Sequence, residues 1–425
     1  MSVEQERRWI YLDSAATSLH RPPEVAEAVL SAMASVGNCG RGSGETALAG
    51  ARVVYEARRL VDELFHGYGA EQTVFTMNAT ESLNIAIKGL LQSGDKVLTT
   101  VMEHNSVLRP LYEMEAAGVQ VERIGCKGEE NAVRMRGELD LEALLAAIRP
   151  DVKVVCVTHA SNLTGNVNPL RLIGERCRKV GALFLVDASQ TAGVFPIDMQ
   201  RDCIDVLCFT GHKGLLGPQG TGGLCIRRGV HIRPLLSGGS GILTYSKTHP
   251  SVLPTALEAG TMNAHGLAGL AAGVRWILDR GVEVLREREL ALAARFYEQV
   301  REIPQVKIYG NAEKLRRGNT GEIGQGQVAI VALNVGELDS GELSDWLMQE
   351  YGIVTRAGGH CAPLMHEALG TREQGAVRFS FSYWNQEEEI ERAVQAVREI
   401  AQSEAGVEID DETNNTTGSP RDCGK

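Results

Sequence analysis

The sequence predicts an α/β protein with a mostly parallel seven-stranded sheet flanked by helices, followed by a smaller α+β domain. Short, continuously apolar runs alternate with helical patterns between about residues 50 and 230. Continuous apolarity is typical of parallel strands that are buried on both faces. The chain has 425 residues, more than one ordinary hydrophobic core needs, which favours two domains.

Seven apolar runs define the predicted sheet. They are Thr73–Met77, Lys96–Thr100, Val119–Ile124, Val152–Thr158, Leu183–Asp187, Ile204–Phe209 and Gly222–Ile226. A loop rich in Gly joins the last two runs and leaves no room for a crossover helix. Because parallel neighbours need such a crossover, we expect Gly222–Ile226 to be antiparallel.

Near Pro254 the pattern changes to that of a smaller α+β unit. Helices are predicted over Gly266–Arg280, Val282–Ile303 and Ser340–Glu350, and strands over Val328–Asn334, Ile353–Arg356 and Ala376–Ser382. Asn385 is expected to cap a terminal helix that has Glu388 at its third position. The predicted domains are residues 15–255, and residues 1–14 with 256–403. The polar residues 404–425 are expected to form a disordered tail.

Composition excludes several classes of function. The net charge is −11, and no basic stretch could displace counterions from a nucleic acid. No apolar run approaches the roughly 20 residues that span a bilayer. The N-terminus lacks the basic-then-apolar order of a signal peptide. We therefore expect a cytoplasmic protein that binds neither nucleic acid nor membrane.

The cysteines and histidines predict neither disulfides nor a metal site. The nine cysteines form no C-x-x-C pair, and Cys156, Cys208 and Cys225 lie inside apolar runs, where a thiol usually serves as a small hydrophobe. The histidines lack paired spacing, and the adjacent His360 and Cys361 are poorly placed to chelate one ion.

Lys213 and Asp187 are the first candidate site residues. Lys213 directly follows a buried strand and enters a glycine-rich loop, which suits an amine that captures an aldehyde as a Schiff base. The alternative is a surface lysine on a turn. Asp187 ends the preceding strand, at the same sheet edge, where its carboxylate can keep a pyridine nitrogen protonated. Its alternative role is that of a helix cap.

Three further strand-end loops carry polar side chains. Ala79 and Thr80 open a helical pattern that suits a phosphate, His104 can stack on an aromatic ring, and Asn162 offers an amide. The plainer interpretations are an N-cap and a structural histidine. Taken together, the five loops offer an amine, a ring-nitrogen partner, a phosphate cradle, a stacking ring and an amide. This combination predicts pyridoxal 5′-phosphate (PLP) as the cofactor.

Over about residues 10–402 the chain resembles the class V aminotransferase group of fold-type I PLP enzymes, and within it the cysteine desulfurases and selenocysteine lyases. The resemblance rests on the segments Tyr11–Ser18, Asp187–Gln190 and Gly211–Lys213. It implies that Lys213 carries PLP and that His104 stacks on the ring. The other cofactor contacts that it implies are Gln190 to the ring hydroxyl, and Thr80, Thr210 and His212 to the phosphate.

Two more segments extend the resemblance. Glu258–Thr261 matches a segment in which the threonine, here Thr261, reaches the phosphate across a dimer interface, which implies a homodimer with shared active sites. Arg356–Pro363 resembles the loop that presents the desulfurase nucleophile. This implies that Cys361 takes sulfur from L-cysteine as a persulfide and that alanine is released. A buried structural thiol is the alternative.

The neighbours of Cys361 have expected roles as well. His360 and Arg356 are expected to favour the thiolate electrostatically. Arg378, a strand arginine among apolar neighbours, is expected to bind the substrate carboxylate with help from Asn162 and Arg356. The alternative for Arg378 is an internal salt bridge.

The loop that carries Cys361 is short, as in the second desulfurase group, which implies that a sulfur-acceptor protein or thiol must come to the site. Two positions depart from the family pattern: Pro363 follows Ala362 immediately, and Gly44 replaces a usual histidine. They leave open the preference between L-cysteine and L-selenocysteine, and whether the sulfur feeds iron–sulfur cluster assembly. The alternatives are a selenocysteine lyase, a cysteine C–S lyase without a persulfide, and a non-catalytic sulfur-relay scaffold.

Overall fold

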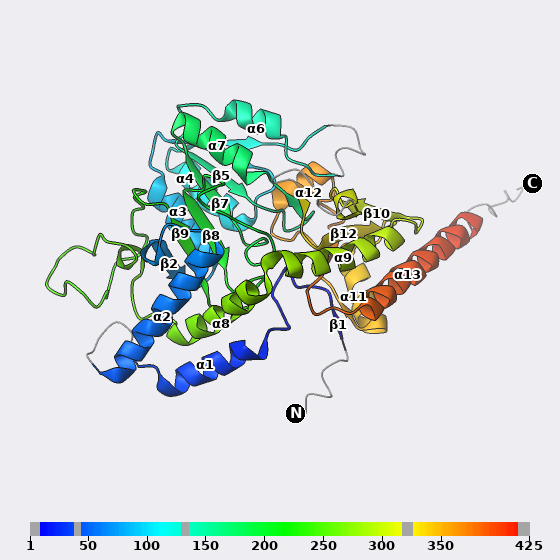
Figure 1. The fold of residues 1–425 in the computed structure, drawn as a ribbon. Coiled ribbons are helices and arrows are strands. Elements are labelled where there is room, and N and C mark those ends of the chain that lie inside the picture. Colours follow the sequence, from blue (N-terminus) through cyan, green and yellow to red (C-terminus); the bar gives the residue numbers. More distant parts are fainter. Residues whose placement is uncertain (1–8, 38–43, 129–135, 317–325, 415–425) are drawn as a thin grey trace, which may run out of the picture.

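A seven-stranded sheet forms the centre of the larger part of the molecule (Figure 1). The computed structural model describes residues 9–37, 44–128, 136–316 and 326–414. The sheet order is β2-β9-β8-β7-β5-β3-β4. The strands are β2 (Thr73–Thr76), β3 (Lys96–Thr100), β4 (Gln120–Ile124), β5 (Val154–Thr158), β7 (Leu183–Asp187), β8 (Val206–Thr210) and β9 (Gly222–Ile226). All seven predicted strands are present.

The strand directions agree with the prediction. The pairs β3–β4, β3–β5, β5–β7 and β7–β8 are parallel. Strand β9 is antiparallel to both β2 and β8, which confirms the expected exception. Because β3, β5, β7 and β8 run in one direction, the loops that follow them meet at one edge of the sheet. Thr158 pairs with Asp187, and Asp187 with Cys208, at this edge.

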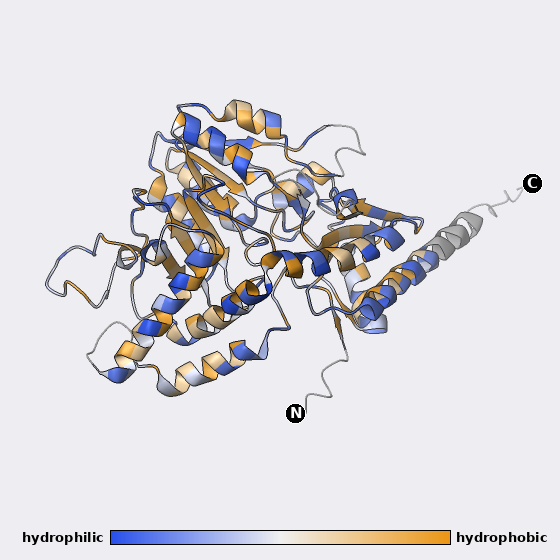
Figure 2. Cartoon of the chain, viewed as in Figure 1, coloured by the Kyte–Doolittle hydropathy of each residue, from blue (hydrophilic) through white to orange (hydrophobic). Residues whose placement is uncertain are grey.

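Helices cover both faces of the sheet and explain its continuous apolarity. Val155, Val157 and Phe209 pack into one core cluster, whereas Cys156 and Cys208 pack into the cluster on the opposite face. The strands at the centre of the sheet are accordingly mainly hydrophobic in Figure 2, while the helices are mixed. The helices are α1 (Pro23–Ser35), α2 (Glu45–Leu64), α3 (Ala79–Leu90), α4 (Asn105–Ala116), α6 (Leu141–Ala147), α7 (Leu170–Val180) and α8 (Ala264–Arg280).

The smaller part has its own apolar core. Its antiparallel sheet has the order β10-β12-β14 and is packed by α9, α11 and α13. The N-terminal strand β1 (Ile10–Tyr11) pairs with β13 (Ile353–Val354), and Ile10 and Leu12 join this core. The strands are β10 (Val306–Tyr309), β12 (Ile330–Val335) and β14 (Val377–Ser380); the helices are α9 (Val282–Val300), α10 (Glu313–Arg316), α11 (Ser340–Tyr351), α12 (Pro363–Leu369) and α13 (Glu387–Asn414). The short strands β6 (Asn166–Val167) and β11 (Gly326–Gln327) pair with each other. The domain boundaries themselves remain a prediction.

Helix α13 differs from the prediction at both ends. Asn385 does not cap it, because its Oδ1 accepts a bond from the backbone of Ser382 instead. The carboxylate of Glu389 accepts from the backbone N–H of Gln386, so the cap lies one residue later than expected. The helix continues to Asn414 and so includes residues 404–414 of the predicted tail. An established helix gains a backbone bond with each added residue, and no proline interrupts it before Pro420. The rest of the predicted tail, residues 415–425, lies outside the described residues.

The structure also bears on the cysteines, on membrane-spanning helices and on clusters of possible metal ligands. Cys156, Cys208 and Cys225 are buried free thiols, as predicted. In the described ranges, no helix has both the length and the apolarity to cross a membrane. The same ranges contain no group of three or more His, Cys, Asp or Glu side chains suited to a metal ion.

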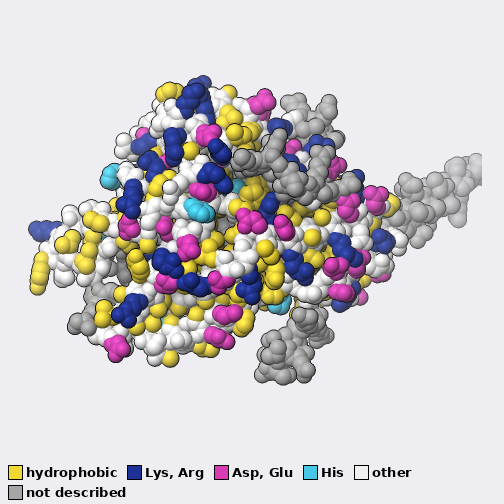
Figure 3. All heavy atoms as spheres, viewed as in Figure 1, with side chains coloured by type: hydrophobic (Ala, Val, Ile, Leu, Met, Phe, Trp, Pro, Cys, Tyr) yellow, Lys and Arg dark blue, Asp and Glu magenta, His cyan; other side chains and the backbone are white. Residues whose placement is uncertain are grey.

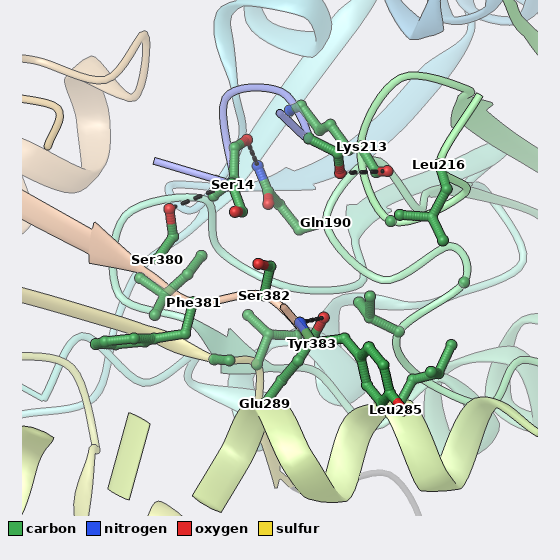
Figure 4. A pocket seen from close by; sticks show the side chains of 18 of the residues that line it. Ser14, Gln190, Lys213, Leu216, Leu285, Glu289, Ser380, Phe381, Ser382 and Tyr383 are labelled. Atoms are coloured by element: carbon green, nitrogen blue, oxygen red, sulfur yellow. Dashed lines mark hydrogen bonds between the residues drawn. The ribbon is translucent and has the colours of Figure 1, made fainter. Parts of the chain in front are cut away.

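A half-buried glutamate lies where α9 meets the larger part. Glu289 points into a small pocket of about 50 Å³, together with Trp276, Leu285 and Tyr383 (Figure 4). The backbone N–H of Tyr383 donates to its Oε1 at 3.1 Å. Burial raises the pKa of Glu289 to about 8. The carboxyl is therefore mostly protonated in the folded protein at neutral pH.

This raised pKa predicts a pH-dependent stability effect. Between pH 4.5 and about 8 the folded protein keeps a proton that the unfolded chain has lost, so this group contributes less stability as the pH rises. Glu289→Gln removes the titration but keeps the acceptor. We expect the variant to gain about 1–3 °C in melting temperature over the parent at pH 8, and less at pH 5.

The matched control is Glu27→Gln, which changes an exposed carboxylate on α1. It should shift the melting temperature equally at both pH values. An equal shift for Glu289→Gln at pH 5 and pH 8 would show that Glu289 does not titrate with a raised pKa.

Candidate functional site

Lys213 lies at the sheet edge where the strand-end loops meet. It follows β8 by three residues, and its side chain is half-buried, facing the pocket of Figure 4. Burial, with a contribution from the cations of Arg378 and Arg356, lowers the pKa of Lys213 to about 8, although Asp187 opposes the shift. A substantial share of this amine is therefore neutral near pH 7 to 8. The surface-lysine alternative is inconsistent with these surroundings.

Asp187 ends β7, the parallel neighbour of β8, as expected. Its Oδ1 accepts bonds from the backbone N–H and the hydroxyl of Ser189, at 2.9 and 2.5 Å. Among the described residues, nothing donates to Oδ2. Residues 189–194 form turns, so Asp187 is not the cap of a helix. Its second oxygen is therefore available to a ligand donor.

His104 caps helix α4, and its imidazole is held in one orientation. Its Nδ1 accepts from the backbone N–H of Ser106 at 3.0 Å, which caps α4 and fixes the ring orientation. Burial lowers the pKa of His104 to about 4, against the opposing effect of Asp187. The ring is therefore neutral at physiological pH and carries its proton on Nε2. This arrangement fits a stacking ring, and the cap interpretation is also correct.

Glu103 is a site residue to which sequence reasoning gave no role. Its Oε1 accepts from the hydroxyl of Thr100 at 2.7 Å and from the backbone N–H of Thr158 at 3.1 Å. Its buried Oε2 has no partner among the described residues. Burial, with a contribution from Asp187, raises the pKa of Glu103 to about 8. The sequence feature that could have identified Glu103 is a charged residue just after the apolar strand Lys96–Thr100.

The expected phosphate contacts lie around the start of α3. Ala79 and Thr80 open this helix, whose first backbone N–H groups have no intrahelical acceptor. A Cβ at Gly222 would lie 2.6 Å from the backbone of Asn78, so only glycine lets β9 approach this turn so closely. The hydroxyl of Thr210 is buried without a partner among the described residues. The turn thus combines unpaired donors with a close backbone approach, as an anion cradle requires.

Three other side chains that were predicted to contact the cofactor form hydrogen bonds with residues of this chain. The hydroxyl of Thr80 contacts that of Ser106 at 2.8 Å, and Nδ1 of His212 contacts the hydroxyl of Thr17 at 3.0 Å. Burial, with the charge of Lys213, lowers the pKa of His212 to about 4. Nε2 of Gln190 donates to the carbonyl of Ala15 at 3.2 Å (Figure 4).

Arg378 forms the internal salt bridge that the sequence offered as the alternative. It is 2% exposed, and its Nη2 bonds Oδ1 of Asp13 at 2.8 Å. Its Nη1 donates to the backbone carbonyl of Asn162 at 2.8 Å, while Nε has no partner among the described residues. Sequence reasoning missed Asp13 as a partner. The guanidinium retains donor capacity for an anion, because it has five N–H groups.

Cys361 is exposed, which contradicts the buried-thiol alternative. His360 and Cys361 both have left-handed backbones, with φ of 50° and 55°. Such a conformation costs roughly 1–2 kcal/mol per residue, so surrounding bonds must hold it. Nδ2 of Asn162 donates to the carbonyl of His360, and the backbone N–H of Asn105 donates to that of Cys361, both at 2.7 Å.

His360 does not play the electrostatic role that we expected. It is 4% exposed, and burial together with the Arg378 cation lowers its pKa to about 3. A neutral imidazole adds no positive charge beside Cys361. Arg356 is exposed and is the remaining cation of this loop.

Thr261 lies apart from the other predicted contacts within the single chain. It lines a separate hollow of about 350 Å³ with Tyr55, Arg58 and Glu258. Glu258 pairs with Arg58 at 2.7 Å and accepts from the backbone of Phe75, which fixes the segment before Thr261. Gly44 is the N-cap of α2, and the glycine-rich stretch just before it lies outside the described residues.

The chain is similar to a protein-family model and to several known proteins. The family model described as Aminotransferase class-V matches residues 10–393. A probable cysteine desulfurase of Methanothermobacter thermautotrophicus is 31% identical over 93% of this chain and 95% of its own length. The cysteine desulfurase of Haloferax volcanii is 32% identical over 91% and 88%. The apo structure of cysteine desulfurase from Thermococcus onnurineus NA1 has a TM-score of 0.82 at 31% identity, covering 93% and 95%.

The chain belongs to the cysteine desulfurase family of the class-V aminotransferases. This confirms the resemblance and the fold class given by the sequence motifs. The structure of the cysteine desulfurase CsdA from Escherichia coli, with a TM-score of 0.78 at 27% identity, is similar over 93% of the chain. The match to the family model ends at residue 393, before the C-terminal residues that the sequence resemblance, over about 10–402, also left out.

The lowered pKa of Lys213 is directly measurable in this desulfurase-family chain. Only the neutral amine reacts with acetic anhydride, so acetylation of Lys213 in the cofactor-free protein should rise with a midpoint near pH 8, not at the ordinary 10.5. Peptide mapping against an internal standard follows the reaction. Asp187→Asn removes an opposing charge and should lower the midpoint, whereas Arg356→Gln should raise it. A midpoint near 10 in all three proteins would contradict the buried amine.

Proposed function

We propose that the chain is a PLP-dependent cysteine desulfurase that converts L-cysteine to L-alanine and receives the sulfur on Cys361 as a persulfide. One observation carries this proposal. The backbone N–H of Asn105 holds the carbonyl of Cys361 at 2.7 Å, so the exposed thiol is anchored to the loop that carries His104. A nucleophile and the side chains expected around a cofactor are thereby brought together.

The residues present fit PLP. Buried, unpartnered polar atoms on Thr210, Asn162 and Arg378 surround the site within the described part of the chain. Each unmet buried polar group costs about 1–3 kcal/mol, which a polar ligand would recover. Lys213 would hold the aldehyde, Asp187 the ring nitrogen, His104 the ring face and Gln190 the ring hydroxyl. The residues expected at the phosphate are Ala79, Thr80, Thr210 and His212, with Thr261 from a second copy.

When bound, PLP supplies an electron sink that weakens the bond between Cβ and sulfur of the substrate. Arg378 and Asn162 bind the substrate carboxylate through the donor capacity left on the guanidinium and the amide. Lys213, with a pKa of about 8, accepts and returns the α-proton near neutral pH. The substrate is thus oriented with its sulfur toward the Cys361 loop.

Cys361 completes the reaction. Its thiolate attacks the substrate sulfur, a sulfur–sulfur bond forms, and the carbon–sulfur bond breaks. The carbon then takes a proton to give the methyl group of alanine, and the persulfide remains on the enzyme. Because hydrogen bonds from Asn162 and Asn105 to two backbone carbonyls hold the loop, the persulfide stays at the surface, where an acceptor protein or thiol must reach it.

A homodimer with shared sites is part of the proposal. Thr261 lines a hollow whose lining does not include Lys213, which fits a contact with the phosphate of another copy of the chain. The loop that projects at the left of Figure 3 exposes apolar side chains that a second copy would cover. These side chains are Leu235, Leu236, Ile242, Leu243, Tyr245 and Val252.

Substitution of the nucleophile tests the reaction. Cys361→Ala should lower alanine formation from L-cysteine by about a hundredfold or more, because no thiolate remains to accept the sulfur. Cofactor absorbance should be retained. The matched control, Cys177→Ala, changes a buried thiol on α7 and should keep parental turnover.

Assays with L-selenocysteine, run in parallel, separate the alternatives. Unchanged L-cysteine turnover in Cys361→Ala would identify a C–S lyase without a persulfide. Turnover of L-selenocysteine alone would identify a selenocysteine lyase. Failure of the parent protein to bind PLP would leave a non-catalytic scaffold.

A further inference from the structure

Two histidines are buried side by side beneath the Cys361 loop. His360 is 4% exposed and His366, on α12, is 2% exposed. Nδ1 of His360 lies 3.4 Å from Nε2 of His366, and the two ring planes differ by 10°. The ring centroids are 5.6 Å apart. This is close to the 3.4 Å between the two nitrogens plus the distance from each nitrogen to the centre of its own ring. The nitrogen-to-nitrogen bond therefore lies near a common plane of the rings.

The backbone carbonyl of Arg356 determines which ring nitrogens of His360 and His366 carry protons. Nε2 of His360 contacts the backbone carbonyl of Arg356 at 3.1 Å, and a carbonyl oxygen can only accept. Nε2 of His360 is therefore protonated, and Nδ1 of this neutral ring is an acceptor. Nε2 of His366 must then donate to it. Nδ1 of His366 is left as an acceptor for the hydroxyl of Thr371, 2.8 Å away.

Both rings are held neutral, as this assignment requires. Burial lowers the pKa of His360 to about 3 and also lowers that of His366. Thr371 is itself 3% exposed, and its backbone N–H donates to the carbonyl of His366. The three hydrogen bonds thus point the same way. The hydroxyl of Thr371 donates to His366, His366 donates to His360, and His360 donates to the backbone carbonyl of Arg356.

This chain anchors the residue that precedes the nucleophile. His360 and Cys361 share the left-handed conformation, with their carbonyls bonded to Asn162 and Asn105. These bonds fix the loop from the site side, and the buried imidazole of His360 fixes it from the protein side. With both sides fixed, Cys361 is directed outward and stays exposed.

We propose that His366 and Thr371 are positioning residues for Cys361: through His360 they hold the nucleophile loop in its strained conformation for sulfur transfer. This inference rests on the proposed role of Cys361 as the nucleophile. Neither residue contacts the exposed thiol, so both act through the orientation of His360.

Three substitutions at His366 and Thr371 separate the hydrogen bonds from simple packing. His366→Phe keeps a planar ring but removes both bonds. His366→Gln places an amide N–H near the position of Nε2 and should preserve the bond to His360. Thr371→Val removes the hydroxyl at nearly constant volume, and Thr371→Ser is its rescue variant because it retains the hydroxyl.

The rate of persulfide formation on Cys361 should be measured in a single turnover with L-cysteine, and L-alanine binding by the cofactor's spectral change. We expect His366→Phe to slow persulfide formation about tenfold, since a misplaced reacting group loses rate steeply. His366→Gln and Thr371→Ser should stay within about twofold of the parent, and Thr371→Val should fall below Thr371→Ser. L-alanine binding should not change, because Lys213 and Arg378 are untouched.

Parental rates in both His366→Phe and Thr371→Val would overturn the inference, as would equal losses in His366→Gln and His366→Phe. If His366→Phe does not fold, the Thr371→Val and Thr371→Ser pair decides by itself. Failure of the underlying function has a different signature, because the parent protein would then form no persulfide on Cys361.

Discussion

The buried guanidinium of Arg378 is the interaction on which the rest of the site depends. An isolated buried charge is costly, so a 2% exposed arginine requires partners from wherever the chain can supply them. Asp13 comes from the N-terminal segment and Asn162 from the loop after β5. The backbone of Arg378 also bridges that of Arg356, five residues before Cys361. One residue, through its side chain and its backbone, thereby joins the smaller part, the larger part and the nucleophile loop.

Burial also sets the charge state of most groups around the site. It lowers the pKa of Lys213, His104, His212 and His360, and it raises that of Glu103. All these shifts favour the neutral form. At neutral pH the three imidazoles are therefore uncharged, and of these groups only Lys213 has a pKa near enough to neutrality to exchange protons as a base. The formal charges that remain include those of the Arg378 and Asp13 pair. A site of this kind suits a charged substrate, because few internal ions compete with it.

Much of the fold and part of the site could be predicted from the sequence, for a physical reason. Buried parallel strands leave continuous apolar runs, so all seven strands and the shared sheet edge of Asp187 and Lys213 were recognisable. Contacts between residues far apart in the chain leave no such pattern. The pairing of Arg378 with Asp13 was missed for this reason. The neutrality of His360 depends on burial against His366 and Arg378, which an adjacent Cys361 does not reveal.

Ligand affinities in the PLP-loaded protein test most directly whether Arg378 also receives the substrate carboxylate. L-alanine and ethylamine share an amine, but only L-alanine has a carboxylate. Arg378→Lys keeps a charge but loses the planar fork, so it should weaken L-alanine binding about tenfold or more and leave ethylamine binding unchanged. Equal weakening of both ligands, or unchanged binding of L-alanine, would contradict a direct contact between Arg378 and the substrate carboxylate.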